Sequence, residues 1–169
     1  PGEGTCFTFN LPYLKITRLP ETGEALRQSG FDFAGKVIVI AEDDPSSSNL
    51  IREIFKQTGA TLHMASTGRE AVELVRTLPV TDLVVLDIQM PDMDGHEASR
   101  VIRSIDKRIP MLAQTAFAMA GDRDKIEASG FTECVTKPLS LSLLLTAAAR
   151  CLEAAAAPAK VAAVHREGG

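Results

Sequence analysis

One acidic residue, Asp87, stands where an apolar run of the sequence ends. The run 83–86 lies between Asp82 and Asp87, and Pro91 and Gly95 follow it. An uninterrupted run of this kind is typical of a buried parallel strand. Such a strand would deliver the Asp87 carboxylate to the rim of a sheet, where open α/β folds keep their chemistry. Taken alone, an ordinary aspartate that caps the next helix is the simpler interpretation.

Three consecutive acids, Glu42, Asp43 and Asp44, follow a second buried-strand pattern, 36–41. If these segments are neighbouring parallel strands, the acids lie beside Asp87 at one edge of the sheet. Two unit charges at 4 Å repel by roughly 4 kcal/mol at an effective dielectric of 20. Such a cluster must take up protons or bind a cation. Hard carboxylate oxygens with room for water favour Mg²⁺.

The register of the three acids is open. Asp44 precedes Pro45, a pairing that suits a helix cap followed by the first helical residue. We therefore prefer Glu42 and Asp43 as members of the cluster, with Asp44 in place of Glu42 as the alternative.

Two further motifs complete a recognisable set. Thr115 ends a third strand pattern, and Lys137-Pro138 ends another. With the acids and Asp87, these motifs resemble the receiver domain of two-component signalling, the fold of the bacterial chemotaxis response regulator. The resemblance runs from about Lys36 to Leu152.

The resemblance implies a metal site and a phosphoacceptor. Mg²⁺ would be bound directly by Asp43 and Asp87, by Glu42 mainly through water, and by the main-chain carbonyl of Gln89. Asp87 would be the nucleophile that attacks the phosphorus of a phosphohistidine or of a small acyl phosphate.

Three other residues take roles from the same resemblance. Lys137 would reach a phosphoryl oxygen as a point charge, and Thr115 would donate its hydroxyl to the phosphoryl group. A cis bond before Pro138 would aim the lysine into the site. Cys134 stands where the family usually has Tyr or Phe, which puts in doubt the aromatic rotation that is coupled to Thr115. A small buried hydrophobe is the simpler interpretation of Cys134.

Strand and helix patterns alternate five times after residue 35. Strands are predicted near 36–41, 60–65, 82–87, 110–115 and 133–136. This alternation predicts an α/β fold with a parallel sheet between two helical layers. In the flavodoxin-like, doubly wound (βα)5 arrangement, the strand order is 2-1-3-4-5, and the first and third strands are neighbours.

Apolar residues at helical spacing predict which helix faces are buried. The stripes are Leu50, Ile51, Ile54 and Phe55; Ala71, Val72 and Val75; Ala98, Val101 and Ile102; and Leu141, Leu144, Leu145, Ala148, Cys151 and Leu152. Residues 121–129 are mostly polar, with Ile126 nearly alone, and predict a weakly packed helix.

The composition limits the function classes. The 169 residues are 45% hydrophobic and 24% charged, which suits a soluble globular domain. A net charge of −4 argues against nucleic-acid binding. We find no signal peptide and no run of membrane-spanning length. Three distant cysteines indicate reduced thiols, and we expect a cytoplasmic location, with a parent protein that could be membrane-anchored.

The ends of the chain suggest a larger parent. The chain begins at Pro1 rather than Met, and we expect a piece of a longer protein. Residues 1–12 resemble the glycine motif and closing strand of the histidine-kinase ATP-binding domain, without the other motifs needed to bind ATP. We expect a linker at 13–34, the receiver at 35–153 and a flexible Ala-rich tail at 154–169.

These features predict the receiver of a hybrid sensor histidine kinase. Its partners would be a histidine kinase or a phosphotransfer (HPt) domain. One rival is a pseudo-receiver that docks partners without phosphorylation. A second is a hydrolase of the haloacid dehalogenase type, which would need an Asp where the chain has Gln89.

Overall fold

The computed structural model describes residues 24, 27, 30–116 and 125–156. Five parallel strands form one sheet with the order β2-β1-β3-β4-β5. The strands are β1 (Val37–Ala41), β2 (Thr61–Ala65), β3 (Leu83–Asp87), β4 (Met111–Thr115) and β5 (Glu133–Thr136). The predicted fold class and strand order are confirmed, and the first four strands begin one residue later than predicted.

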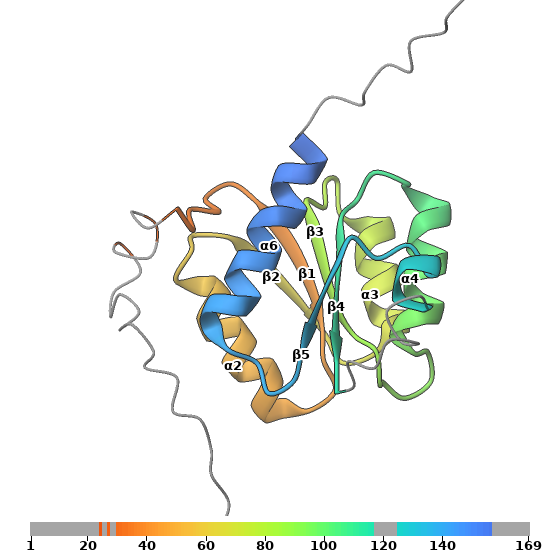
Figure 1. The fold of residues 1–169 in the computed structure, drawn as a ribbon. Helices are drawn as coiled ribbons and strands as arrows, with labels where there is room; N and C mark the ends of the chain where they lie inside the picture. The colour runs from red at the N-terminus through yellow and green to blue at the C-terminus, as the bar shows by residue number, and fades with distance from the viewer. Residues whose placement is uncertain (1–23, 25–26, 28–29, 117–124, 157–169) are drawn as a thin grey trace, which may run out of the picture.

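Four helices described in full cover the two faces of the sheet (Figure 1). They are α2 (Pro45–Lys56), α3 (Gly68–Thr77), α4 (Gly95–Ile105) and α6 (Leu141–Ala156). Helices α2 and α6 share one apolar cluster with the sheet, and α3 and α4 share the other. Side chains alternate between these two layers along each strand, so strands β3 and β4 are buried throughout.

Most of the predicted helix stripes are buried. In α2, Ile51, Ile54 and Phe55 are buried, whereas Leu50 is 50% exposed, so its place in the predicted stripe is wrong. The reason is the helical period, because a residue directly before Ile51 is turned about 100° away from the face that packs on the sheet. Val101 in α4 is only partly buried.

Short-range hydrogen bonds fix where the helices begin. The Asp44 carboxylate accepts from the Ser47 main-chain N–H at 2.8 Å, with Pro45 as the first helical residue, as predicted. Thr67 accepts from the Glu70 N–H at 3.2 Å and caps α3. Each cap satisfies a donor that the first helical turn leaves without a partner.

The described residues extend beyond both predicted ends of the receiver. Before β1, Phe33 is buried against Phe55, with ring centroids 6.3 Å apart, and its N–H donates to the Thr58 carbonyl. Helix α6 continues to Ala156, because alanine is the strongest helix former.

Several predictions lie partly or wholly outside the described residues. They are the closing strand in 1–12, most of the linker, the start of the polar helix and the tail after Ala156. Of that polar helix, residues 125–128 are helical and Ile126 is buried. Within the part of the chain that the structure describes, no helix is both long and apolar enough to cross a membrane.

Candidate functional site

The carboxyl ends of β1 and β3 place two acids side by side. Ala41 pairs in register with Leu86, so Glu42 and Asp87 are the next residues along two neighbouring strands. Both acids are almost fully buried, at 2% and 4% exposure. Their position at the switch between the first and third strands is the one that the sequence predicts.

Lys137 reaches both buried acids from the end of the edge strand β5. Its Nζ lies 2.5 Å from Asp87 Oδ2, 2.8 Å from Glu42 Oε2 and 3.0 Å from Glu42 Oε1. The Lys137 N–H donates to the Thr115 carbonyl, which extends the β4–β5 ladder to the lysine. The Lys137–Pro138 peptide bond is cis, as predicted.

The loop after β3 is folded tightly against Asp87. The Gln89 main-chain N–H donates to Asp87 Oδ1 at 3.0 Å, and the Gly95 N–H donates to the Ile88 carbonyl at 3.0 Å. A Cβ at Gly95 would lie 2.3 Å from the Asp87 carbonyl oxygen, so only glycine fits there. The loop therefore fixes both the backbone and one carboxylate oxygen of Asp87.

Glu42, Asp43 and Asp87 form a cluster suited to a metal ion. One carboxylate oxygen from each lies within 4.8 Å of the others, and Asp43 is exposed to solvent. Asp44 is outside this set because it caps α2. The donors are hard oxygens on an open rim, which fits Mg²⁺ with retained water. The Lys137 ammonium already stands as a cation between Glu42 and Asp87.

Burial and the hydrogen bonds from Lys137 shift the pKa of Glu42 in opposite directions. Burial raises the pKa of Glu42 above the ordinary carboxylic-acid value; the negative charge of Asp87 adds to this, and the hydrogen bonds from Lys137 oppose it. Burial alone would lower the pKa of Lys137, but its hydrogen bonds to Asp87 and Glu42 outweigh burial and raise it. The lysine is therefore a firmly held cation at neutral pH.

Thr115 and Cys134 lie on β4 and β5 beside the cluster. Thr115 is 6% exposed and is the residue after Gln114, which pairs in register with Asp87. Cys134 is partly buried and packs with the apolar cluster under α3 and α4, consistent with the small hydrophobe expected. A hollow of about 100 Å³ lies beside it, lined by residues that include Ile126 and Phe131.

Gln114, paired in register with Asp87, is a buried polar residue beside the site that no sequence pattern singled out. Its side chain is fully buried, and neither Nε2 nor Oε1 has a hydrogen-bond partner among the described residues. The available signal was one long polar side chain in an otherwise apolar strand, next to Thr115.

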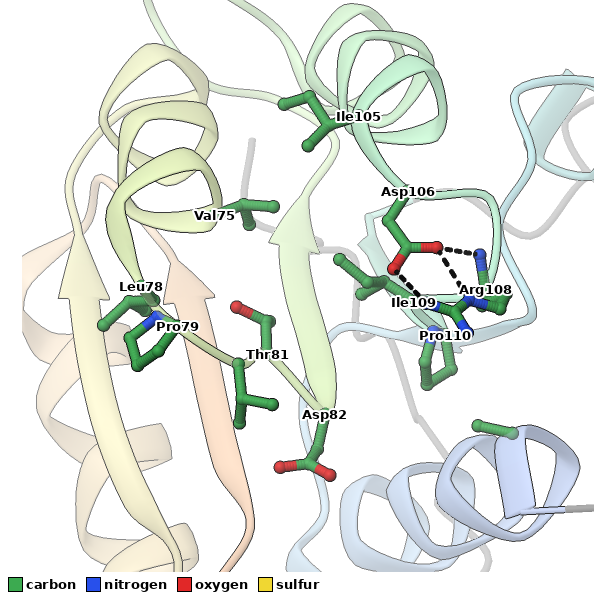
Figure 2. A pocket seen from close by; sticks show the side chains of 12 residues that line it. Val75, Leu78, Pro79, Thr81, Asp82, Ile105, Asp106, Arg108, Ile109 and Pro110 are labelled. Atoms are coloured by element: carbon green, nitrogen blue, oxygen red, sulfur yellow. Dashed lines mark hydrogen bonds and ion pairs between the residues drawn. The ribbon is translucent and has the colours of Figure 1, made fainter.

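Another cavity, of about 510 Å³, lies at the opposite, amino-terminal ends of the strands. Figure 2 shows side chains that line it, among them Thr81 and Asp82, which precede β3, and Pro110, which precedes β4. Its polar side chains include the ion-paired Asp106 and Arg108. It holds none of the predicted site residues, so size alone does not mark the chemistry here.

Comparison with known families and proteins gives one consistent result. The family profile of the response regulator receiver domain matches residues 38–149. The sensor protein EvgS of Escherichia coli is 33% identical over 147 residues, or 86% of this chain and 12% of EvgS. The response regulator DivK of Brucella anthropi is 33% identical over 63% of this chain and 87% of DivK. The chain therefore spans about one eighth of EvgS but most of DivK.

Solved structures agree with the sequence matches. The chemotaxis protein CheY4 of Vibrio cholerae has a TM-score of 0.67 at 25% identity, covering 70% of this chain and all of CheY4. The receiver domain of the sensor histidine kinase PA1611 from Pseudomonas aeruginosa has a TM-score of 0.65 at 28% identity, covering 71% of this chain and 99% of that domain. That structure has a magnesium ion coordinated in its active-site cleft.

Proposed function

The chain belongs to the response regulator receiver domain family, and from that premise we propose that it accepts a phosphoryl group on Asp87 in a two-component phosphorelay. The observation that carries the proposal is the contact between Lys137 Nζ and both Asp87 and Glu42, at the shared edge of three strands. A buried nucleophilic carboxylate with a fixed cation beside it suits transfer of an anionic group.

The reaction needs little covalent help from the protein. A carboxylate oxygen of Asp87 attacks the phosphorus of a phosphohistidine, an O–P bond forms, the P–N bond breaks, and the imidazole leaves with the electron pair. Positioning and charge stabilisation dominate such transfers. The Lys137 ammonium already contacts Asp87, so it can move its hydrogen bond from the carboxylate to a phosphoryl oxygen once the phosphoryl group is attached.

Glu42, Asp43 and Asp87 would hold Mg²⁺, with the Gln89 carbonyl as a further ligand. Bound there, Mg²⁺ would neutralise part of the charge on the transferring phosphoryl group. The fit rests on the clustered carboxylates and on the magnesium ion in the related receiver of PA1611.

The donor and acceptor follow from the kind of parent protein. EvgS is named as a sensor protein, and the chain is similar to one segment of it. We propose that the donor is a histidine kinase, the acceptor is the histidine of an HPt domain, and the domain works in the cytoplasm. The kinase-like resemblance of residues 1–12 supports a hybrid-kinase parent.

Phosphorylation should also change the conformation of the domain and therefore its binding to partners. A two-state element responds to the phosphoryl group only through contacts that differ between the states. Thr115 supplies such a contact, and we expect a smaller response than in receivers with Tyr at position 134. Hydrogen exchange with and without beryllofluoride, an acyl-phosphate mimic, measures this. Unchanged exchange across residues 115–130 would favour a static docking module, which is the alternative function.

Intact-mass measurement after treatment with acetyl phosphate and Mg²⁺ tests the phosphoacceptor role. The wild-type chain should gain one acid-labile phosphoryl group, and Asp87→Asn should gain none. Asp82→Asn is the matched control, because Asp82 directly precedes the opposite end of the same strand, away from the acid cluster. Equal labelling of the Asp87→Asn variant would disprove the assignment.

A further inference from the structure

Gln114 is buried at a cost that no hydrogen bond of its side chain offsets within the described residues. Its amide is fully removed from water and makes no hydrogen bond within the described part of the chain. A buried polar group without a partner destabilises a fold, and such groups call for an explanation in each structure. Leucine or methionine would fill the same strand position without this cost.

The face of the sheet to which Gln114 belongs is the face of the acids. Side chains alternate along a strand, and Leu112 packs with the cluster under α2 and α6, so Gln114 lies on that side. The same reasoning puts Asp87 there, since Val85 belongs to that cluster. Asp87 and Gln114 are paired in register on neighbouring strands.

Lys137 must cross β4 to make its contacts. It follows β5, whereas Asp87 ends β3 and Glu42 follows β1, and β4 lies between β5 and β3. Gln114 pairs in register with Val135, two residues before Lys137, so all three lie on one face. The lysine side chain therefore passes over the strand end that carries the unpaired amide.

All three contacts recorded for the ammonium are to carboxylate oxygens. They are two oxygens of Glu42 and one of Asp87, the same groups that would hold Mg²⁺. A divalent cation and the lysine therefore compete for the same lone pairs. When the carboxylates turn to the metal, the ammonium needs another acceptor on its path, and Gln114 Oε1 is an unused one.

We propose that Gln114 is a positioning residue, which accepts an N–H of Lys137 on Oε1 and keeps the ammonium directed at Asp87 when Mg²⁺ and the phosphoryl group are bound. This inference rests on the proposed function. It explains why a polar side chain occupies a core position, because its hydrogen bond forms only in the loaded state.

The test compares Gln114→Met with Thr81→Val in the full chain. The Thr81 hydroxyl is also buried without a partner among the described residues, but it lies at the opposite, amino-terminal ends of the strands. Both variants should raise the Tm of the metal-free protein by about 4–8 °C, because each removes an unpaired buried group. Only Gln114→Met should weaken binding of Mg²⁺ with beryllofluoride, by about tenfold, measured by titration calorimetry.

A second measurement uses the wild-type chain alone. The Gln114 side-chain NH₂ signals in ¹H–¹⁵N spectra should move when Mg²⁺ and beryllofluoride are added. Wild-type affinity in Gln114→Met, or unmoved signals, would overturn the role of Gln114 and leave the phosphoacceptor proposal intact. A wild-type chain that binds neither Mg²⁺ nor beryllofluoride would overturn both proposals.

Discussion

Lys137 Nζ lies 2.5 Å from Asp87 Oδ2, so a cation and the proposed phosphoacceptor meet although 50 residues separate them in the sequence. The same ammonium also forms an ion pair with the buried Glu42. Among the described residues, Glu42 has no ion pair with any other cation. Lys137 thus offsets one of the three negative charges of the cluster, at a place where part of the metal charge would act.

Replacing Lys137 should lower the stability of the metal-free protein and raise its affinity for Mg²⁺. Lys137→Met leaves two buried carboxylates without their cation, and the side chain is 26% exposed, so we expect a loss of about 2 kcal/mol without metal. Mg²⁺ should bind more tightly to the variant, because its competitor is gone. Chemical denaturation with and without Mg²⁺ measures both effects. A variant as stable as wild type without metal, with unchanged Mg²⁺ affinity, would refute the competition.

The acid cluster predicts an order of metal-binding defects. Asp43→Ala should weaken Mg²⁺ binding most among substitutions of the three consecutive acids, because Asp43 is the exposed member of the cluster and is not bound to Lys137. Asp44→Ala is the matched control, since Asp44 caps α2 instead. Titration of the metal-free protein decides this. A larger loss in Glu42→Ala or Asp44→Ala than in Asp43→Ala would show that the assigned register is wrong.

The cap of α2 predicts a pH dependence. Hydrogen bonds from the Ser47 main-chain N–H and then its hydroxyl lower the pKa of Asp44. Because the folded-state pKa is depressed, this stabilisation is complete above the unfolded value of about 3.9 and is lost as the pH falls through the folded value. The Tm difference between wild type and Asp44→Asn should therefore shrink as the pH falls from 6 to 3. A difference that grows on acidification would contradict this.

The segment before β1 should contribute to stability. Phe33 is 4% exposed and packs on Phe55, although it precedes both the family match and the predicted domain start. Phe33→Ala should cost about 3 kcal/mol in the free energy of unfolding. Leu50→Ala, at a half-exposed position, should cost far less. Equal losses in urea denaturation would mean that this segment is not part of the folded unit.

The main features of the fold could be predicted because the local sequence patterns all indicate the same alternation of strands and helices. Apolar runs such as 83–86 predict buried strands, and the polar residues that end them meet at one edge of a parallel sheet. The pattern for α2 was less exact, because Leu50 is apolar yet points away from the sheet. Composition alone does not tell which apolar residue of an adjacent pair faces the core.

The contacts within the site could be predicted only in part. The sequence indicated that Glu42, Asp87 and Lys137 gather, but not that the lysine bridges both acids, which depends on its path across β4. No sequence pattern predicted that the Gln114 amide would be buried without a partner. An unpaired amide is a property of the packed side chains around it, and no spacing rule reports what a side chain fails to contact.

The most direct test of the central claim is to locate the phosphoryl group chemically. Borohydride reduces an acyl phosphate on aspartate to homoserine, which peptide mapping by mass spectrometry can place in the sequence. After treatment with acetyl phosphate and Mg²⁺, the wild-type chain should contain homoserine at position 87 and at no other aspartate. Homoserine at Asp43 or Asp94 instead, or its absence from a labelled chain, would contradict the proposal that Asp87 is the phosphoacceptor.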